Sequence, residues 1–157
     1  MTGNLYINGL DAFETWGIDL EDGAVTNLMT PPALKELVRN SSRLERGRRY
    51  VVPTSGYATP KYDERQVDLP IHLISTSSTD FFAKYQAFCD DVLIKGAFTL
   101  WVRHIPHKLF HLVYNSCSNF NQTWRVVSVM TLRCTEPNPE DTAPHTGEIV
   151  PQGYISL

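Results

Sequence analysis

The sequence has no long apolar run and no excess of basic residues, and each absence excludes a class of protein. No stretch of about 18 consecutive apolar residues occurs in the 157 residues, so no membrane-spanning helix is predicted. The first residues lack a basic segment followed by an apolar one, so we expect no secretory leader. Seventeen acidic against fourteen basic residues give a net charge of −3, which removes the general attraction to a polyanion that many nucleic-acid-binding domains use.

Cysteine and catalytic signatures are also scarce. Cys89, Cys117 and Cys134 cannot all pair within the chain, and no two have the CxxC spacing of a zinc or redox site, so we expect reduced, buried thiols. No Gly-x-Ser-x-Gly elbow and no phosphate-binding loop pattern occurs. The sequence therefore predicts neither an enzyme nor a cofactor, and no small-molecule substrate.

The composition is that of a folded domain with one core. Hydrophobic residues make up 42% of the chain and charged residues 20%, and 157 residues is close to the usual size of a single domain. We place the domain at residues 1–136. Proline, glycine and acidic residues dominate thereafter, so residues 137–157 are predicted to form an extended or disordered C-terminal arm.

The clearest predicted element is an α-helix over about residues 78–95. Ser77 and Asp80 have the spacing of a capping box, and Gly96 stands where a helix ends. Apolar residues recur between them at helical spacing: Phe81, Tyr85, Phe88, Cys89 and Val92. This stripe predicts a helix packed on a sheet rather than a cofactor site.

Alternating residues predict strands on both sides of this helix. Residues 65–75 alternate cleanly, and Pro70 within them cannot donate to a ladder, which favours an edge strand or a bulge. Three more strands are predicted at 97–103, 109–117 and 124–134, joined by connections of hairpin length at 104–108 and 118–123.

The N-terminal part is less regular. We expect two short strands within residues 4–29 and at most a short helix after Pro31 and Pro32, with Leu34, Leu37 and Val38 on one face. The resulting fold class is mainly β (α+β), an antiparallel β-sandwich or small barrel with one flanking helix.

Three histidines, His104, His107 and His111, have spacings that would converge on one side of a helix. Pro106 lies between the first two, and β-forming residues flank all three, so a turn between strands is the better interpretation. No acidic residue or cysteine within the segment completes a ligand set, so we predict no metal site here, and a metal-dependent hydrolase is not favoured.

The stretch RNSSRLERGRRY concentrates arginine in an otherwise acidic chain. It opens a long irregular loop or hairpin excursion, residues 39–64, and excursions of this length in compact domains usually serve binding or assembly. Three interpretations stay open: a nucleic-acid-binding module, a solvated loop, and a subunit contact. The contact candidates are Arg39, Arg43, Arg46, Arg48, Arg49 and, on its separate edge strand, Pro70.

Three segments carry a resemblance to a known family: residues 11–51, beginning DAFETWGIDLEDG; residues 63–92, beginning DERQVDLPIHLIS; and LRCTEPNP near the C-terminus. Together they resemble tail proteins of phages and prophages of Bacteroides-like bacteria, similar to the N-terminal domain of the siphophage distal tail protein. The resemblance covers about residues 4–139, and its motifs are structural rather than catalytic.

The resemblance implies a tail-tube-like β-sandwich whose copies assemble into a homo-oligomeric ring, for example a hexamer, around a DNA channel. It implies other tail proteins as partners, DNA that only passes through, and a place in the virion tail after assembly in the bacterial cytoplasm. The excursion at 39–64 occupies a suitable place for a loop that reaches the next subunit. A second, galectin-like domain of distal tail proteins has no counterpart here, so the station in the tail (hub, tube or completion ring) stays open.

Overall fold

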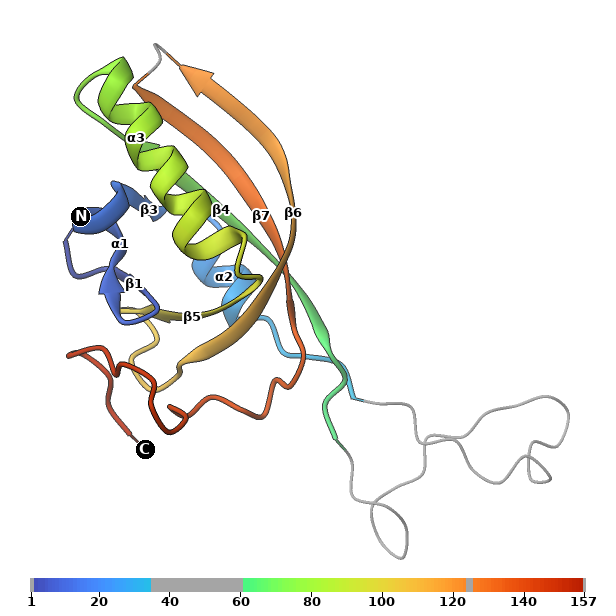
Figure 1. Cartoon of the computed structure of the whole chain (residues 1–157). Helices are drawn as coiled ribbons and strands as arrows, with labels where there is room; N and C mark the ends of the chain where they lie inside the picture. The colour runs from blue at the N-terminus through green and yellow to red at the C-terminus, as the bar shows by residue number, and fades with distance from the viewer. Residues whose placement is uncertain (1, 35–60, 124–125, 157) are drawn as a thin grey trace, which may run out of the picture.

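The strands form one antiparallel sheet of seven strands in the order β2-β1-β5-β6-β7-β4-β3 (Figure 1). The computed structural model describes residues 2–34, 61–123 and 126–156. The strands are β1 (Leu5–Ile7), β2 (Leu10–Asp11), β3 (Ile18–Leu20), β4 (Arg65–Ile74), β5 (Ala97–Val102), β6 (Phe110–Thr123) and β7 (Val127–Glu136). The helices are α1 (Ala12–Trp16), α2 (Ala24–Met29), α3 (Ser78–Phe88) and the π-helical turn η3 (Cys89–Leu93). The predicted mainly-β class with a flanking helix is confirmed.

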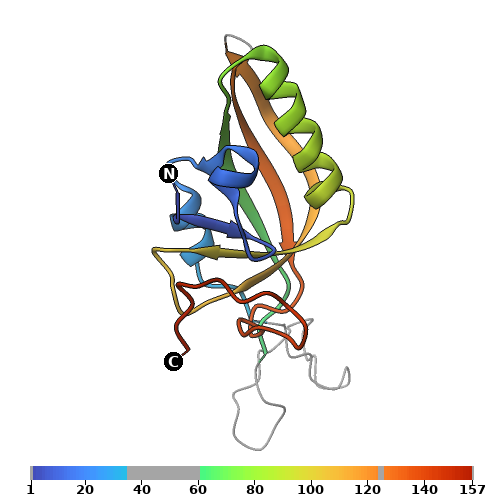
Figure 2. The same cartoon turned by 60° about the vertical axis from the view of Figure 1, so that its left-hand side comes forward.

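The hydrophobic core lies between one face of this sheet, its inner face, and the helices. In β7 the residues from Ser128 to Glu136 alternate between buried and partly or fully exposed, as predicted for a strand with one dry side. The neighbouring strand β4 shows the same alternation, and its buried Leu69 pairs with Leu132 of β7. Figure 2 shows α3 running along these long strands. Each fully buried side chain of this size stabilises the fold by about 1.5–3 kcal/mol.

Helix α3 begins and ends near the predicted residues. The Ser77 hydroxyl accepts a hydrogen bond from the Asp80 amide (3.1 Å), and the Asp80 carboxylate accepts one from the Thr76 amide (3.1 Å). The hydrogen bond from the Thr76 amide is the main reason that the pKa of Asp80 is lowered, and Lys84 lowers it further. Gly96, with φ of 79°, follows the last turn as expected. The last helical residues, from Cys89, form a π-helix that the apolar spacing did not predict.

Replacing Ser77 by alanine should lower the free energy of unfolding by about 1 kcal/mol, because the Asp80 amide loses its capping partner. Thr79→Ala is the matched control, since Thr79 is exposed in the same turn and caps nothing among the described contacts. Urea denaturation monitored by circular dichroism measures both. Equal stability of the two variants would show that the cap contributes nothing.

One sequence prediction near the N-terminus is wrong, and a second falls mostly outside the described residues. Residues 4–29 contain three short strands and two short helices instead of two strands. Of the short helix expected after Pro31, only the beginning up to Leu34 is described; it is not helical, and Leu34 forms an isolated antiparallel bridge with Tyr62. The nearby helix is α2, which starts directly after Gly23. Its few residues are too short a window for helical periodicity to be visible.

Strand β6 is longer than predicted. Residues 118–123 were expected to be a connection, but they continue β6 to Thr123. The register with β7 shifts twice, between Tyr114 and Ser116 and between Ser118 and Asn121, and Asn119 has a positive φ of 54°. Each bulge interrupts the alternation of side chains, which is the signal that sequence reasoning uses to recognise a strand.

The C-terminal residues 137–156 contain no strand or helix and lie against the outer face of the sheet, below β5 in Figure 1. The Leu109 amide donates to the Thr142 carbonyl (2.9 Å). Gly153 passes over the ring of Trp101 so closely that a Cβ atom would lie 2.4 Å from a ring carbon, and Trp101 is buried although it is on the outer face. The division into a domain at 1–136 and an arm at 137–157 stays a prediction.

Candidate functional site

The half of β6 that follows Tyr114 forms an open edge of the sheet. Strand β5 pairs only with residues 110–113 of β6, so beyond them one side of β6 has no strand partner within residues 2–34, 61–123 and 126–156. The two bulges lie in this part, and Phe120 is 48% exposed there while contacting Tyr85 edge-on. Open strand edges are surfaces to which another chain can add. We call residues 115–123 the β6 edge.

Beside this edge, the outer face of the sheet carries a partly apolar surface. Ile74 and Val129 are 40% and 38% exposed, and they lie on neighbouring strands that pair in register, Ile74 with Val127 and His72 with Val129. Pro70 and Thr131 form the next pair on the same face. This surface, Pro70, His72, Ile74, Val127, Val129 and Thr131, is the distal face. Exposed apolar residues gathered on two strands indicate a contact surface.

Pro70 lies on β4 at the point where pairing with β3 ends. Strand β4 has neighbours on both sides, but β3 pairs only with Leu73, His72 and Ile71. The Pro70 carbonyl accepts from the Glu21 amide (2.8 Å), so the missing N–H of proline points to the same side, away from β7. The predicted edge character therefore holds for the part of β4 that precedes Ile71, where α2 lies alongside. The role of Pro70 as a subunit contact stays a prediction.

The two described ends of the predicted excursion lie side by side. Leu34 bridges Tyr62, and the Asp63 amide donates to the Ala33 carbonyl (2.8 Å). The five arginines of the predicted contact, Arg39, Arg43, Arg46, Arg48 and Arg49, lie outside the described residues.

A buried ion pair links the start of β4, directly after the excursion, to the end of β7. Arg65 contacts Glu136 (2.8 Å) from the first position of β4 to the last of β7, and its side chain is 10% exposed against 2% for Glu136. The same guanidinium donates to the main-chain carbonyls of Leu28 (3.1 Å) and Thr30 at the end of α2. Burial raises the pKa of Glu136, although Arg65 acts in the opposite direction. Helix α2, β4 and β7 thus meet at one buried charge pair.

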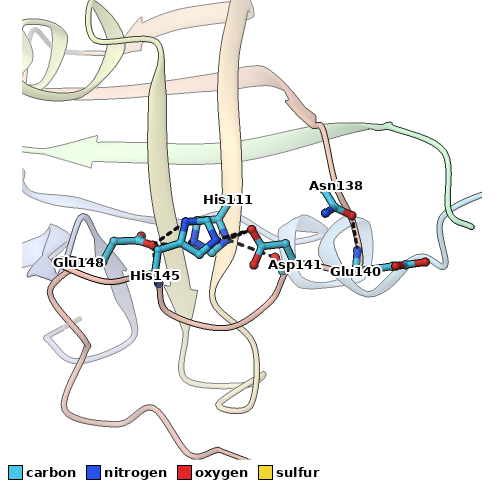
Figure 3. A network of polar contacts seen from close by, with 6 residues as sticks. All are labelled: His111, Asn138, Glu140, Asp141, His145 and Glu148. Carbon is cyan, nitrogen blue, oxygen red and sulfur yellow. Dashed lines mark hydrogen bonds and ion pairs between the residues drawn. The ribbon is translucent and has the colours of Figure 1, made fainter.

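A second polar cluster joins β6 to the C-terminal segment (Figure 3). His111 from β6 stacks on His145, with ring centroids 4.1 Å apart and planes 9° from parallel. Glu148 Oε1 lies 3.0 Å from His111 Nε2 and 3.2 Å from His145 Nδ1. Asp141 lies on the opposite side of both rings: its carboxylate contacts His145 Nε2 and is 3.8 Å from His111 Nδ1. Two imidazoles are therefore held between two carboxylates.

The three histidines that are close in sequence do not form one cluster. His104 and His107 lie in the connection between β5 and β6, where His104 is exposed and His107 contacts the Ile155 carbonyl (3.2 Å). Among the three, only His111 belongs to the cluster that the structure describes. His145 was missed because it is far from His111 in the sequence; the His-x-x-Glu spacing of His145 and Glu148 was the one available signal.

The surroundings of the three cysteine thiols do not favour a nucleophile. All three cysteines are free; Cys134 is buried as predicted, Cys89 is half-buried, and Cys117 is exposed on the β6 edge, which corrects the expectation of buried thiols. Burial raises the pKa of Cys134 to about 12, and partial burial raises the pKa values of Cys89 and Cys117 as well. Since the thiolate is the reactive form, these positions do not favour thiol chemistry at neutral pH.

The described architecture is an antiparallel sheet with a flanking helix and an open strand edge. Within residues 2–34, 61–123 and 126–156, no helix combines the length and apolar character needed to cross a bilayer.

A solved structure shares this fold. The crystal structure of the Dit (gp 19.1) protein of phage SPP1 is described as a paradigm of the hub adsorption apparatus in phages that infect Gram-positive bacteria. The two superimpose with a TM-score of 0.58 and 9% identity over 87% of this chain. The chain spans half the length of SPP1 Dit. No family model matches the sequence, and no curated protein matches it either. The likeness to Dit is one of fold.

Proposed function

We propose that this protein is a structural component of a phage tail, related to the distal tail proteins, and that its copies form a ring around the DNA channel. The observation that carries the proposal is the fold: 87% of the chain superimposes on half of a phage tail hub protein. The sequence resemblance to distal tail proteins points to the same class independently. The origin in phages or prophages of Bacteroides-like bacteria stays a prediction from that resemblance, and the station in the tail stays open.

The surfaces of the sheet suit a subunit of a ring. In a closed ring each subunit presents two different surfaces to its neighbours, and repeated contacts close by rotation. The β6 edge offers unpaired backbone groups on one side of the molecule, and the distal face offers exposed Ile74 and Val129 next to it. We assign the excursion at 39–64 to the same assembly, as an arm that contacts the adjacent subunit, and Pro70 as a contact residue of the distal face. DNA passes through the lumen without specific binding, and other tail proteins bind the ring above and below.

The ring is tested on the purified chain by light scattering after gel filtration and by negative-stain electron microscopy. We expect closed rings, with a hexamer as the working expectation. Reversing Arg46, Arg48 and Arg49 to glutamate should weaken ring formation and leave the melting temperature unchanged, because arginine pairs with carboxylates across interfaces. Ile74→Glu combined with Val129→Glu tests the distal face in the same way, since both side chains are already partly exposed.

The matched control reverses Lys95, Arg103 and Lys108, three exposed cations away from the distal face, and so introduces the same change of charge. Rings that persist in the arginine variant but not in the distal-face variant would assign the contact to the sheet alone. Monomers at high protein concentration for the unmodified chain, also after addition of a phage tail fraction, would contradict the proposal.

The sequence also allows a small nucleic-acid-binding module that uses the arginines of residues 39–49. The same triple variant distinguishes this function from ring assembly. It predicts DNA binding that falls steeply with salt and is lost in the variant. A flat titration at low salt would exclude it.

A further inference from the structure

The contacts of the histidine cluster constrain where the ring protons lie. The main-chain carbonyl of Asp141 is 3.2 Å from His111 Nδ1, and a carbonyl can only accept, so Nδ1 carries the proton of this contact. A neutral imidazole has one N–H, and its second nitrogen then has a lone pair. The second nitrogen of His111, Nε2, is 3.0 Å from Glu148 Oε1. Two electron-pair donors therefore face one another.

His145 repeats this arrangement in the opposite sense. In the tautomer with its proton on Nε2, His145 donates to the Asp141 carboxylate, and its Nδ1 is 3.2 Å from the same Glu148 Oε1. Glu148 Oε1 also accepts from the His145 main-chain amide (2.7 Å), which fixes the carboxylate in place. One nitrogen of each ring and one carboxylate oxygen thus lie close together. Because the rings are stacked 9° from parallel, the exposed His145 ring has to turn for both lone pairs to reach one cation, which would then turn their repulsion into attraction.

We propose that His111, His145 and Glu148 bind one zinc ion and that the ion fastens the C-terminal segment to β6. One ligand atom from each of the three residues lies within 4.8 Å of the other two. Tetrahedral ligands at about 2.0–2.1 Å from zinc are roughly 3.3 Å apart, close to the observed nitrogen–oxygen separations of 3.0 and 3.2 Å. Two imidazole nitrogens and one carboxylate oxygen are a ligand set that suits zinc better than magnesium or calcium.

Asp141 has the place of an orienting partner. It contacts the nitrogen of each imidazole that points away from the ion, through its carbonyl for His111 and its carboxylate for His145. Histidines that bind zinc commonly donate their other N–H to such groups, which fixes the tautomer. The fourth position opens toward a hollow lined by Thr99, Val113 and Pro137, so a water molecule or a side chain from a neighbouring copy can complete the tetrahedron.

The inference does not depend on the proposed tail function, because it rests on the geometry within one chain. Without a metal, the same contacts are hydrogen bonds that join the C-terminal segment to β6 through the two stacked rings. Metal binding and a metal-free hydrogen-bonded cluster differ in what they predict for added zinc.

The test uses the untagged, full-length chain after treatment with EDTA. Isothermal titration with zinc should show one ion per chain and a raised melting temperature, and cobalt should give the visible absorption of a tetrahedral site. His145→Ala should weaken zinc binding by more than about 100-fold, since it removes a ligand, and Asp141→Asn by about 10–100-fold, since it changes the orienting partner. His145 is 54% exposed, so its replacement leaves the body of the fold intact.

His104→Ala is the matched control, an exposed histidine of the same chain outside the cluster, and it should bind zinc like the unmodified chain. Absence of saturable zinc binding, or equal affinity of the His145 and His104 variants, would overturn the proposal and leave a metal-free hydrogen-bonded cluster. Loss of zinc binding does not alter the test of the ring.

Discussion

Replacing Arg65 by methionine should destabilise the fold by about 3–5 kcal/mol at about pH 7.5, because it leaves Glu136 ionised and buried without its cation. It also removes the donor to the carbonyls of Leu28 and Thr30 at the end of α2. The contact lies at the base of the excursion, so we expect the same variant to reduce ring formation at temperatures near its melting point. Urea denaturation at two pH values measures the effect.

The pH dependence of this variant has a definite sign. Burial already raises the pKa of Glu136 in the folded protein, and loss of Arg65 raises this pKa further. The folded state then holds the proton more tightly than the unfolded state, so the stability that this group contributes is present at low pH and is lost as the pH rises through the folded pKa. The cost of Arg65→Met should therefore shrink at about pH 5 relative to about pH 7.5.

Two further variants distinguish the contribution of the charges of Arg65 and Glu136 to stability from that of their packing. Glu136→Gln should cost less than Arg65→Met at neutral pH, because the Arg65 guanidinium is less buried than Glu136 and keeps its hydrogen bonds to the Leu28 and Thr30 carbonyls. The double variant Arg65→Met with Glu136→Leu should recover most of the lost stability, since apolar side chains replace a buried ion pair with little net change. A pH-independent cost, or a double variant as unstable as the single one, would contradict this account.

Gly17→Ala should destabilise the fold by about 2–4 kcal/mol, from backbone strain together with a steric clash. Gly17 ends α1 with φ of 69°, and a Cβ atom there would lie 2.3 Å from the Ile74 carbonyl oxygen. The Ile74 amide donates to the Gly17 carbonyl (2.9 Å), so the two backbones cannot separate without breaking this bond. Thermal unfolding followed by circular dichroism measures the loss.

Gly96→Ala is the control for this prediction. Gly96 has a similar φ of 79° and follows a helical turn in the same way, but no atom lies within 4 Å of the position of its Cβ. It should therefore cost only the strain, about 1 kcal/mol. If the two variants were equally stable, the close approach of α1 to the end of β4 would not be a constraint on the fold.

The parts of the fold that follow a local rule were predictable. The capping pair Ser77 and Asp80 and the spacing of Phe81 and Phe88 indicated α3, because a single helix turn brings these residues together whatever surrounds them. The alternation from Ser128 to Cys134 predicted a strand with one drier side, as β7 has. Wherever the pattern broke, as at the bulges beyond Tyr114, the prediction ended the strand too early.

The sites depend on pairings that no local pattern records. Arg65 meets Glu136 because β4 and β7 pair in that register, and a shift by one residue would turn one of the two side chains to the other face of the sheet. His111 and His145 stack because residues 137–156 return over the outer face of β5 and β6. The arginines at 39–49 are the opposite case, a signal that is evident in the sequence and whose role is left to the assembly experiment.

The class of the fold, the long helix and the alternation of strands β4 and β7 could be read from the sequence alone. These features depend on residues a few positions apart, whose relation the backbone geometry sets directly. The strand order, the open β6 edge, the buried charge pair and the histidine cluster became visible in the folded chain. Each of these needs two segments distant in the chain to meet, and their meeting depends on the packing of the whole core.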